Sequence, residues 1–221
     1  MKIKIYQSFY KPEQFASLDK AFIPYNNLKN LNPQLSEYPL IIDLYSKNFN
    51  YDGYWGMMSW RFNEKTNISG SKFIDLISAN PGYDVYHYNP FHGAKLSYNN
   101  PFTHGEDHHP GMVNFINRLL LLMGYNIDIK LENFAEDHFV FCSYYVGNQR
   151  FWENWMSFQD SAMTIANNDQ QLNTYLYHTL TNYRDKSIIN FSFVIERLVN
   201  LFLHLYSKQF LVKGFNKFTL S

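Results

Sequence analysis

Residues 80–90, Asn-Pro-Gly-Tyr-Asp-Val-Tyr-His-Tyr-Asn-Pro, carry the most information about the fold. The Asn-Pro-Gly run ends the preceding segment, and residues 83–88 are typical of a short strand that stops at Asn89 and the proline after it. Alternation along a strand places Asp84 and Tyr86 on one face and His87 and Asn89 on the other. Asp84 is a candidate metal-binding carboxylate. The alternative is that backbone amides in the turn after Gly82 donate hydrogen bonds to this carboxylate.

The residues before this strand predict a layered α/β domain. Ile3 and Ile5 alternate with polar residues and indicate an opening strand, and residues 12–35 are rich in Pro and Asn and are expected to form an ordered loop. Helices are predicted over residues 37–47 and 71–79, the second capped by Ser69, with an aromatic segment at 54–62 between them. This order favours ligand binding at the carboxyl ends of the strands.

The second half of the chain predicts more helix. Helices are expected over residues 110–122, closed by Gly124, over 149–158 and over 188–206, with a buried strand at 139–146. No repeat or linker divides the sequence. We therefore predict a single domain over residues 1–221 with a helical C-terminal segment at about 160–221.

Composition excludes some classes of function. Lys and Arg total 19 and Asp and Glu total 19, so no basic surface for nucleic acid is expected. The single cysteine, Cys142, lies in an apolar run and is predicted to be a buried hydrophobe in a reducing compartment. Residues 1–7 do not have the pattern of a signal peptide, and no apolar run is long enough to cross a membrane. A cytoplasmic protein is expected.

Residues 104–111, His-Gly-Glu-Asp-His-His-Pro-Gly, gather ionisable groups before a predicted helix. Histidines here could ligate a metal or donate to phosphate, and Glu106 or Asp107 could act as a general base. A helix cap with solvated histidines is the alternative. The spacing is not the His-Glu-X-X-His pattern of zinc proteases.

Two further patterns admit a binding role and a packing role. Trp55 and Trp60, with Arg61 and Lys65 nearby, could stack a sugar or base and contact phosphate, although aromatic clusters usually form core. The apolar stripe of residues 188–206 is predicted to cover the sheet. Peripheral contact of this helix with a membrane is the alternative.

Several separated motifs together resemble a family of bacterial glycosyltransferases found in gene clusters for O-antigen and capsule polysaccharides. They are the segments Ile5–Gln7, Phe22–Asn27, Tyr54–Gly56, Ser59–Thr66, Asn80–Tyr86, Asn89–Phe91, Gly105–Glu106, His108–Gly111, Tyr144–Gly147, Phe151–Trp152 and Glu196–Arg197. The resemblance covers most of the chain. It implies a compact GT-A-like (Rossmann-like) nucleotide-sugar-binding domain that transfers a hexose, for example galactose, to a lipid-linked glycan in bacterial surface polysaccharide synthesis.

The resemblance also implies roles for individual residues. Glu106 and Asp107 are the expected catalytic residues, with Glu106 as the base, and Asp84, His108 and His109 are the expected ligands of Mn²⁺ or Mg²⁺. Tyr86 stands two residues after Asp84, where a second acidic residue would complete a metal motif, so strict metal dependence is not implied. The expected residues for binding the donor, a UDP-sugar, are Tyr6, Gln7, Asn27, Trp55, Trp60, Arg61, Lys65, Asp84, Tyr86 and Asn89.

The implied acceptor is a glycan or lipid-linked oligosaccharide. The expected location is the cytoplasm, and peripheral contact at the inner face of the plasma membrane is the alternative. Two other classes of function stay open on the sequence. One is a metal-dependent hydrolase that uses His104, Asp107, His108 and His109. The other is a non-catalytic glycan-binding module that uses the aromatic surfaces.

Overall fold

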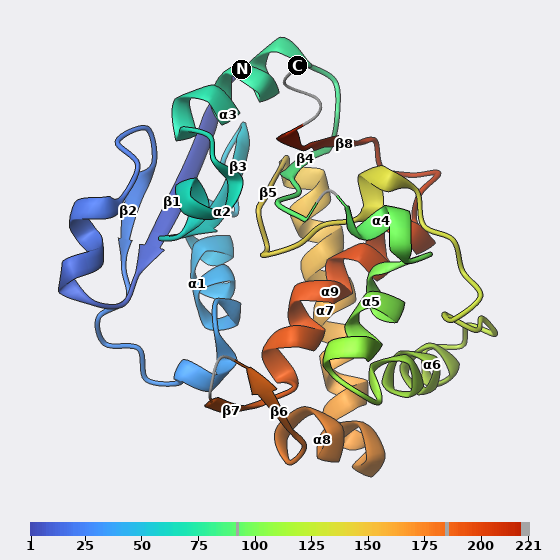
Figure 1. Ribbon diagram of the computed structural model, residues 1–221. Helices are drawn as coiled ribbons and strands as arrows, with labels where there is room; N and C mark the ends of the chain where they lie inside the picture. Colours follow the sequence, from blue (N-terminus) through green and yellow to red (C-terminus); the bar gives the residue numbers. More distant parts are fainter. Residues whose placement is uncertain (92, 184–185, 218–221) are drawn as a thin grey trace.

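A mixed six-stranded sheet organises the chain, which the computed structural model describes at residues 1–91, 93–183 and 186–217 (Figure 1). The strands are β1 (Ile3–Phe9), β2 (Ile23–Asn26), β3 (Tyr54–Ser59), β4 (Val85–Tyr88), β5 (Tyr145–Gly147) and β8 (Val212–Phe215), in the order β2-β1-β3-β5-β4-β8. Only β5 runs antiparallel to its neighbours in this sheet. The predicted α/β class is confirmed.

The two faces of the sheet bury different side chains, because successive residues of a strand point to opposite sides. On β3, Trp55 and Met57 join one apolar cluster and Met58 joins the other. The first cluster packs against α1 (Tyr38–Asn48), α7 (Gln149–Asn168) and α9 (Phe191–Leu205). The second packs against α2 (Phe62–Thr66) and α3 (Gly70–Ala79). Helices therefore cover both faces of the sheet.

The remaining helices gather beside α9 (Figure 1). They are α4 (Ala94–Ser97), α5 (Pro101–His108), α6 (Met112–Leu122) and α8 (Gln170–Tyr177). A two-stranded hairpin of β6 (Leu180–Tyr183) and β7 (Lys186–Ile189) precedes α9, and short 3-10 turns lie at Pro12–Ser17, Pro33–Leu35 and Glu136–His138.

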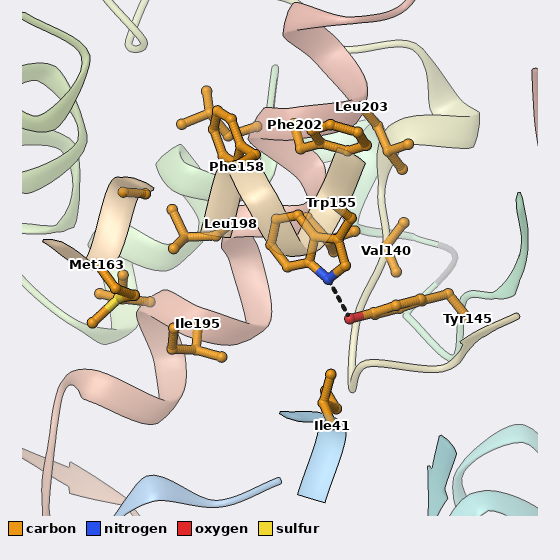
Figure 2. Packing of buried hydrophobic residues seen from close by; sticks show 14 of the residues in the cluster. Ile41, Val140, Tyr145, Trp155, Phe158, Met163, Ile195, Leu198, Phe202 and Leu203 are labelled. Atoms are coloured by element: carbon orange, nitrogen blue, oxygen red, sulfur yellow. Dashed lines mark hydrogen bonds between the residues drawn. The ribbon is translucent and has the colours of Figure 1, made fainter. Parts of the chain in front are cut away.

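Aromatic packing joins the helices to the sheet. Figure 2 shows Trp155 of α7 directed at Tyr145 of β5, and the indole Nε1 donates to the tyrosine hydroxyl at 3.2 Å. Phe158 and Phe202 pack beside this pair, with ring centroids 5.6 Å apart. Nearby, Trp55 stacks on Trp152 at 3.8 Å. Large buried rings of this kind contribute much of the apolar area that stabilises the domain.

Several predicted elements are confirmed. The helix predicted over residues 37–47 is present as α1, shifted by one residue. The helix predicted over residues 71–79 is present as α3. Ser69 caps α3, since its hydroxyl accepts from the amide of Lys72 at 3.2 Å. The apolar stripe of α9 is buried in the core, so the alternative of this stripe lying on a membrane is wrong. Within the described residues, no helix is long and apolar enough to span a membrane.

Other predictions are wrong for identifiable reasons. Residues 12–35 contain strand β2, which their Pro and Asn content concealed. The strand expected over 139–146 is reduced to Tyr145–Gly147, because Cys142 and Ser143 have φ angles of 61° and 55° and so form a turn. Helix α7 runs to Asn168, ten residues past the predicted end at 158. The segment at about 160–221 also supplies a strand, β8, to the main sheet.

Candidate functional site

A cleft opens where β1 and β3 end. Strand β1 connects onward to β2 on one side, whereas the neighbouring β3 connects onward to β4 on the other side. Connections from these two adjacent strands thus leave in opposite directions, and such a switch point is where open α/β sheets bind ligands. Tyr10 follows β1, Ser59 ends β3, and Trp60 follows it. These three residues line a cavity of about 280 Å³, which we call the first lobe.

A second cavity of about 280 Å³, the second lobe, adjoins the first. The residues that line both lobes are Lys65, Cys142, Phe193 and Glu196. Helix α9 thus forms a wall common to the two lobes, and α2 supplies the lysine at their boundary. A ligand could extend from one lobe to the other past Lys65.

The first lobe has basic and acidic walls. Arg61 and Lys65 bring positive charge from the segment after β3, and Arg61 pairs with Glu64. Carboxylates come from Glu37, which precedes α1, and from Glu196 on α9. The cleft can therefore meet a negatively charged ligand on one side and accept a proton on the other.

The second lobe gathers histidines around a buried guanidinium. His104, His108 and His109 line it together with Arg197 of α9. The imidazoles of His104 and His108 lie 4.9 Å apart. Burial, followed by the positive charge of Arg197, lowers the pKa of His104 to about 4 and that of His109 to about 3. Both rings are therefore neutral at pH 7.

The turn at Cys142 and Ser143 separates the lobes. Two consecutive non-glycine residues in the left-handed region are unusual, and such conformations concentrate at functional sites. The turn leads into Tyr144, whose hydroxyl lies 2.8 Å from the Oγ of Ser59. Burial is the main cause that raises the pKa of the Cys142 thiol to about 12, so the sulfur is protonated at pH 7.

Four of the residues predicted to bind the donor lie at this cleft or beside it. Trp60, Arg61 and Lys65 line the first lobe, and the indole Nε1 of Trp60 donates to the Tyr10 hydroxyl at 3.3 Å. Asn27 lines a neighbouring cavity of about 630 Å³, which shares Tyr10 with the first lobe. These positions are compatible with contact to one extended ligand.

Tyr6 and Gln7 of β1 have structural roles instead. The Tyr6 hydroxyl donates to the Asn48 side chain at 3.1 Å. The Gln7 amide is fully buried, donating to the Ser59 carbonyl at 3.2 Å and accepting from the Asp19 amide at 2.7 Å. Gln7 therefore holds the segment around the cleft together without lining it.

Trp55, Tyr86 and Asn89 are also absent from the cleft walls. Trp55 and Tyr86 are fully buried in the two apolar clusters, and the Tyr86 hydroxyl donates to the backbone carbonyl of Asn80 at 2.6 Å. The Asn89 side chain accepts from the amide of Phe91 at 2.7 Å and so shapes the turn after β4. The contacts that the structure shows for these three residues are packing and turn formation, and their role in donor binding stays a prediction.

Asp84 lies at the amino end of β4, whereas the cleft lies at the carboxyl ends of the parallel strands. Its carboxylate accepts from the Asn148 side chain at 3.0 Å and the Leu211 amide at 2.9 Å, and it pairs with Arg150 at 3.3 Å. Asp84 thus joins β4 to α7 and to the segment before β8. The expected metal set of Asp84, His108 and His109 does not converge on one ion.

Glu106 and Asp107 are held away from the cleft as well. Both lie within α5, not in the loop expected there. Glu106 accepts from the amides of Gly111 and Val113 at 2.8 and 2.7 Å, which stabilises the start of α6. Asp107 accepts from the Tyr98 hydroxyl at 2.7 Å. Neither carboxylate lines a lobe, so the structure does not bring the two expected catalytic residues to this cleft.

Glu37, Glu196 and Arg197 line the lobes but are not among the predicted site residues. Glu196 and Arg197 interrupt the apolar stripe of α9, and Arg197 falls on its buried face between Val194 and Leu201. A charged residue on a buried helical face is a usable sequence signal. Glu37 gave no such signal, because acidic residues are common just before helices.

Comparison of the chain with known protein families, with curated proteins and with solved structures returned no match. No group of three or more His, Cys, Asp or Glu side chains within residues 1–91, 93–183 and 186–217 is placed to hold a metal ion.

Proposed function

We propose that the protein is a glycosyltransferase that moves a hexose from a nucleotide-diphosphate sugar to a glycan acceptor. The observation that carries this proposal is the cleft at the carboxyl ends of β1 and β3, where Trp60, Arg61 and Lys65 face the carboxylates of Glu37 and Glu196. The motif resemblance supplies the finer terms of the proposal, which are a GT-A-like fold, a UDP-sugar donor, galactose as the hexose and a lipid-linked acceptor.

The first lobe suits a nucleotide diphosphate. An indole offers a flat face for a base or sugar ring, and Trp60 contributes one at the rim of the lobe. Arg61 and Lys65 are positioned to stabilise the negative charge that develops on a diphosphate leaving group. In this proposal the donor therefore lies in the first lobe, with its sugar directed at the boundary with the second.

Glu196 is the proposed general base. It lines both lobes, so an acceptor hydroxyl entering from the second lobe would meet the donor sugar beside this carboxylate. Transfer then forms the bond from the acceptor oxygen to the anomeric carbon and breaks the bond from that carbon to the diphosphate. Glu196 takes the hydroxyl proton.

Asp84, the carboxylate expected to bind the divalent ion, is held at the other end of the sheet, so the expected set of Asp84, His108 and His109 does not form. We therefore assign charge neutralisation to Arg61 and Lys65, and no step is derived through a metal. The histidines proposed for a hydrolase lie in the second lobe, but Asp107 is bound by Tyr98. That geometry does not favour the hydrolase.

Thermal unfolding with a panel of nucleoside diphosphates tests the proposal, since a ligand that binds the folded state raises Tm. UDP is expected to raise Tm, and manganese or magnesium is added in parallel. The matched variants are Lys65→Ala, in the cleft, and Lys72→Ala, exposed on α3. The shift should diminish only in Lys65→Ala. No shift with any nucleotide in the folded protein would refute the proposed function.

A further inference from the structure

Arg197 is a buried cation at the wall of the second lobe. Its side chain is only 4% exposed. The Nε donates to the Pro101 carbonyl at 3.2 Å and Nη1 to the Phe193 carbonyl at 3.0 Å, while Nη2 lies 3.5 Å from the Nδ1 of His104. These contacts fix the plane of the guanidinium between α5 and α9.

No carboxylate of the described residues neutralises this charge at hydrogen-bond distance. The nearest ion-pair partner, Glu196, has its Oε1 3.9 Å from Nη1 and is shared with the wall of the first lobe. A guanidinium has five N–H donors, and the carbonyls of Pro101 and Phe193 together with the Nδ1 of His104 engage only part of them. Buried charges are normally paired, because removal from water is costly. The second lobe therefore has the charge and free donor capacity to accept an anion.

The surrounding residues are arranged around this guanidinium. A Cβ on Gly105 of α5 would lie 3.0 Å from the Nε of Arg197, so glycine permits the close approach of α5 to the arginine. His109 is 4% exposed and stacks on Phe193 at 3.7 Å. Its Nδ1 has no hydrogen-bond partner among the described residues. Such an atom is a further potential contact for a ligand.

We propose that the second lobe binds a phosphate group, held by the guanidinium of Arg197 and the imidazoles of His104, His108 and His109. Arginine presents a planar fork that matches phosphate oxygens, and imidazole N–H groups add donors around the same anion. The phosphate belongs either to the donor diphosphate or to the acceptor. That role rests on the proposed function, whereas binding of the anion does not.

Calorimetric titration with inorganic phosphate tests the assignment on the full chain. Saturable binding to the wild type is expected, weakened at least about tenfold in Arg197→Lys, which keeps the charge but loses the fork. Gly105→Ala should weaken it by displacing the arginine. Arg118→Lys is the matched control, since Arg118 pairs with Asp169 away from the cleft. His108→Ala alters an exposed residue of the second lobe, so we expect this variant to fold. Its phosphate binding therefore tests the assignment even if Arg197→Lys or Gly105→Ala fails to fold.

Weaker binding in His108→Ala and Arg197→Lys, with the control unchanged, supports the assignment. Folded wild type that binds no phosphate, or equal binding in both variants, overturns it. Competition then identifies the source: displacement of phosphate by UDP assigns the lobe to the donor diphosphate, and simultaneous binding assigns it to the acceptor. Phosphate binding without any UDP binding would refute the proposed function and leave the phosphate site standing.

Discussion

The Nζ of Lys65 lies 3.1 Å from the Sγ of Cys142, at the boundary of the two lobes. This contact joins α2, which follows β3, to the left-handed turn that precedes β5. The ammonium also lies 5.8 Å from the centroid of the Tyr144 ring. A change at this boundary should therefore affect both lobes. The reactivity of Cys142, the chain's single cysteine, can be used to detect such a change.

Cys142 should react slowly with iodoacetamide in the folded protein. Burial, then the negative charge of Glu196, raises the pKa of the thiol to about 12, so little thiolate exists at pH 8. We expect alkylation at least about tenfold slower than in denaturant. Mass spectrometry over time measures it, and UDP should slow it further because Cys142 lines the first lobe. Equal rates in the folded and denatured chain would contradict the burial of this thiol.

Glu196 and Glu106 are expected to differ in the kind of defect that their substitution causes. Glu196→Gln should lower the rate of sugar transfer about 10²- to 10⁴-fold while the fold survives, because the proposed base is lost. Glu106→Ala should instead lower the free energy of unfolding by about 2 kcal/mol, since two amides at the start of α6 lose a charged acceptor. Transfer assays and urea unfolding separate the two effects. A transfer defect in Glu106→Ala at a temperature where it is folded would restore Glu106 to the site.

Asp84→Asn should reduce stability without altering ligand binding. The carboxylate is 13% exposed and holds Asn148, Arg150 and the Leu211 amide, so its loss should cost about 1–3 kcal/mol in the free energy of unfolding. Asp52→Asn, whose side chain is 97% exposed, is the matched control and should be neutral. Nucleotide-induced changes in Tm would be compared in both. Loss of the nucleotide response in Asp84→Asn alone would place Asp84 in the binding site.

The sequence predicted elements well where local signals agreed. Ser69 capped α3 as expected, and the helical period of α9 placed its apolar stripe in the core. Strand β2 was missed because its residues, Ile23–Asn26, are too few and too rich in turn formers to show alternation. The turn at Cys142 was missed because its apolar neighbours are typical of a strand. Only the φ angles reveal it.

The site was harder to predict than the fold, because side-chain direction depends on tertiary packing. Trp60, Arg61 and Lys65 reach the cleft because β3 ends there. Trp55, five residues before Trp60, lies within β3 and is fully buried. On the sequence alone, Glu106 and Asp107 are both candidates for the general base. Their hydrogen bonds to the start of α6 and to Tyr98, which form only in the fold, hold them away from the two lobes.

Buried histidines outside the cleft should make the fold sensitive to acid. Burial lowers the pKa of His87 to about 4, and burial followed by the charge of His204 lowers that of His138 to about 4. Since the unfolded pKa is about 6.5, the unfolded chain binds more protons between pH 6.5 and 4, and stability falls as pH decreases through this window. The slope should approach about 1.4 kcal/mol per pH unit for each histidine.

Urea unfolding between pH 7.5 and 4 measures this dependence. His87→Gln should flatten the slope, because the substituted residue does not titrate, although the amide replaces only part of the contact between His87 Nε2 and the Asp137 carbonyl. A stability that stays constant from pH 7 to 5 would show that these rings are accessible to protons in the folded state.

Gly56→Ala should be the most destabilising of the substitutions considered. In the antiparallel pair of β3 and β5, Gly56 lies opposite Val146, and an added Cβ would lie 2.2 Å from the backbone carbonyl oxygen of Tyr145. Backbone atoms of a buried sheet cannot move aside cheaply, so we expect a loss of about 3 kcal/mol or more. The turn at Cys142 directly precedes β5. Separation of β5 from β3 should therefore displace this turn and disrupt the cleft.

Gly93→Ala is the matched control for this change. A Cβ there would meet nothing within 4 Å, and its φ of −81° suits any residue. Its free energy of unfolding should therefore stay within about 0.5 kcal/mol of the wild type. Chemical unfolding of both variants, with circular dichroism at 222 nm as a check on the fold, decides the matter. Equal stability of the two variants would mean that β3 and β5 are not closely paired at Gly56.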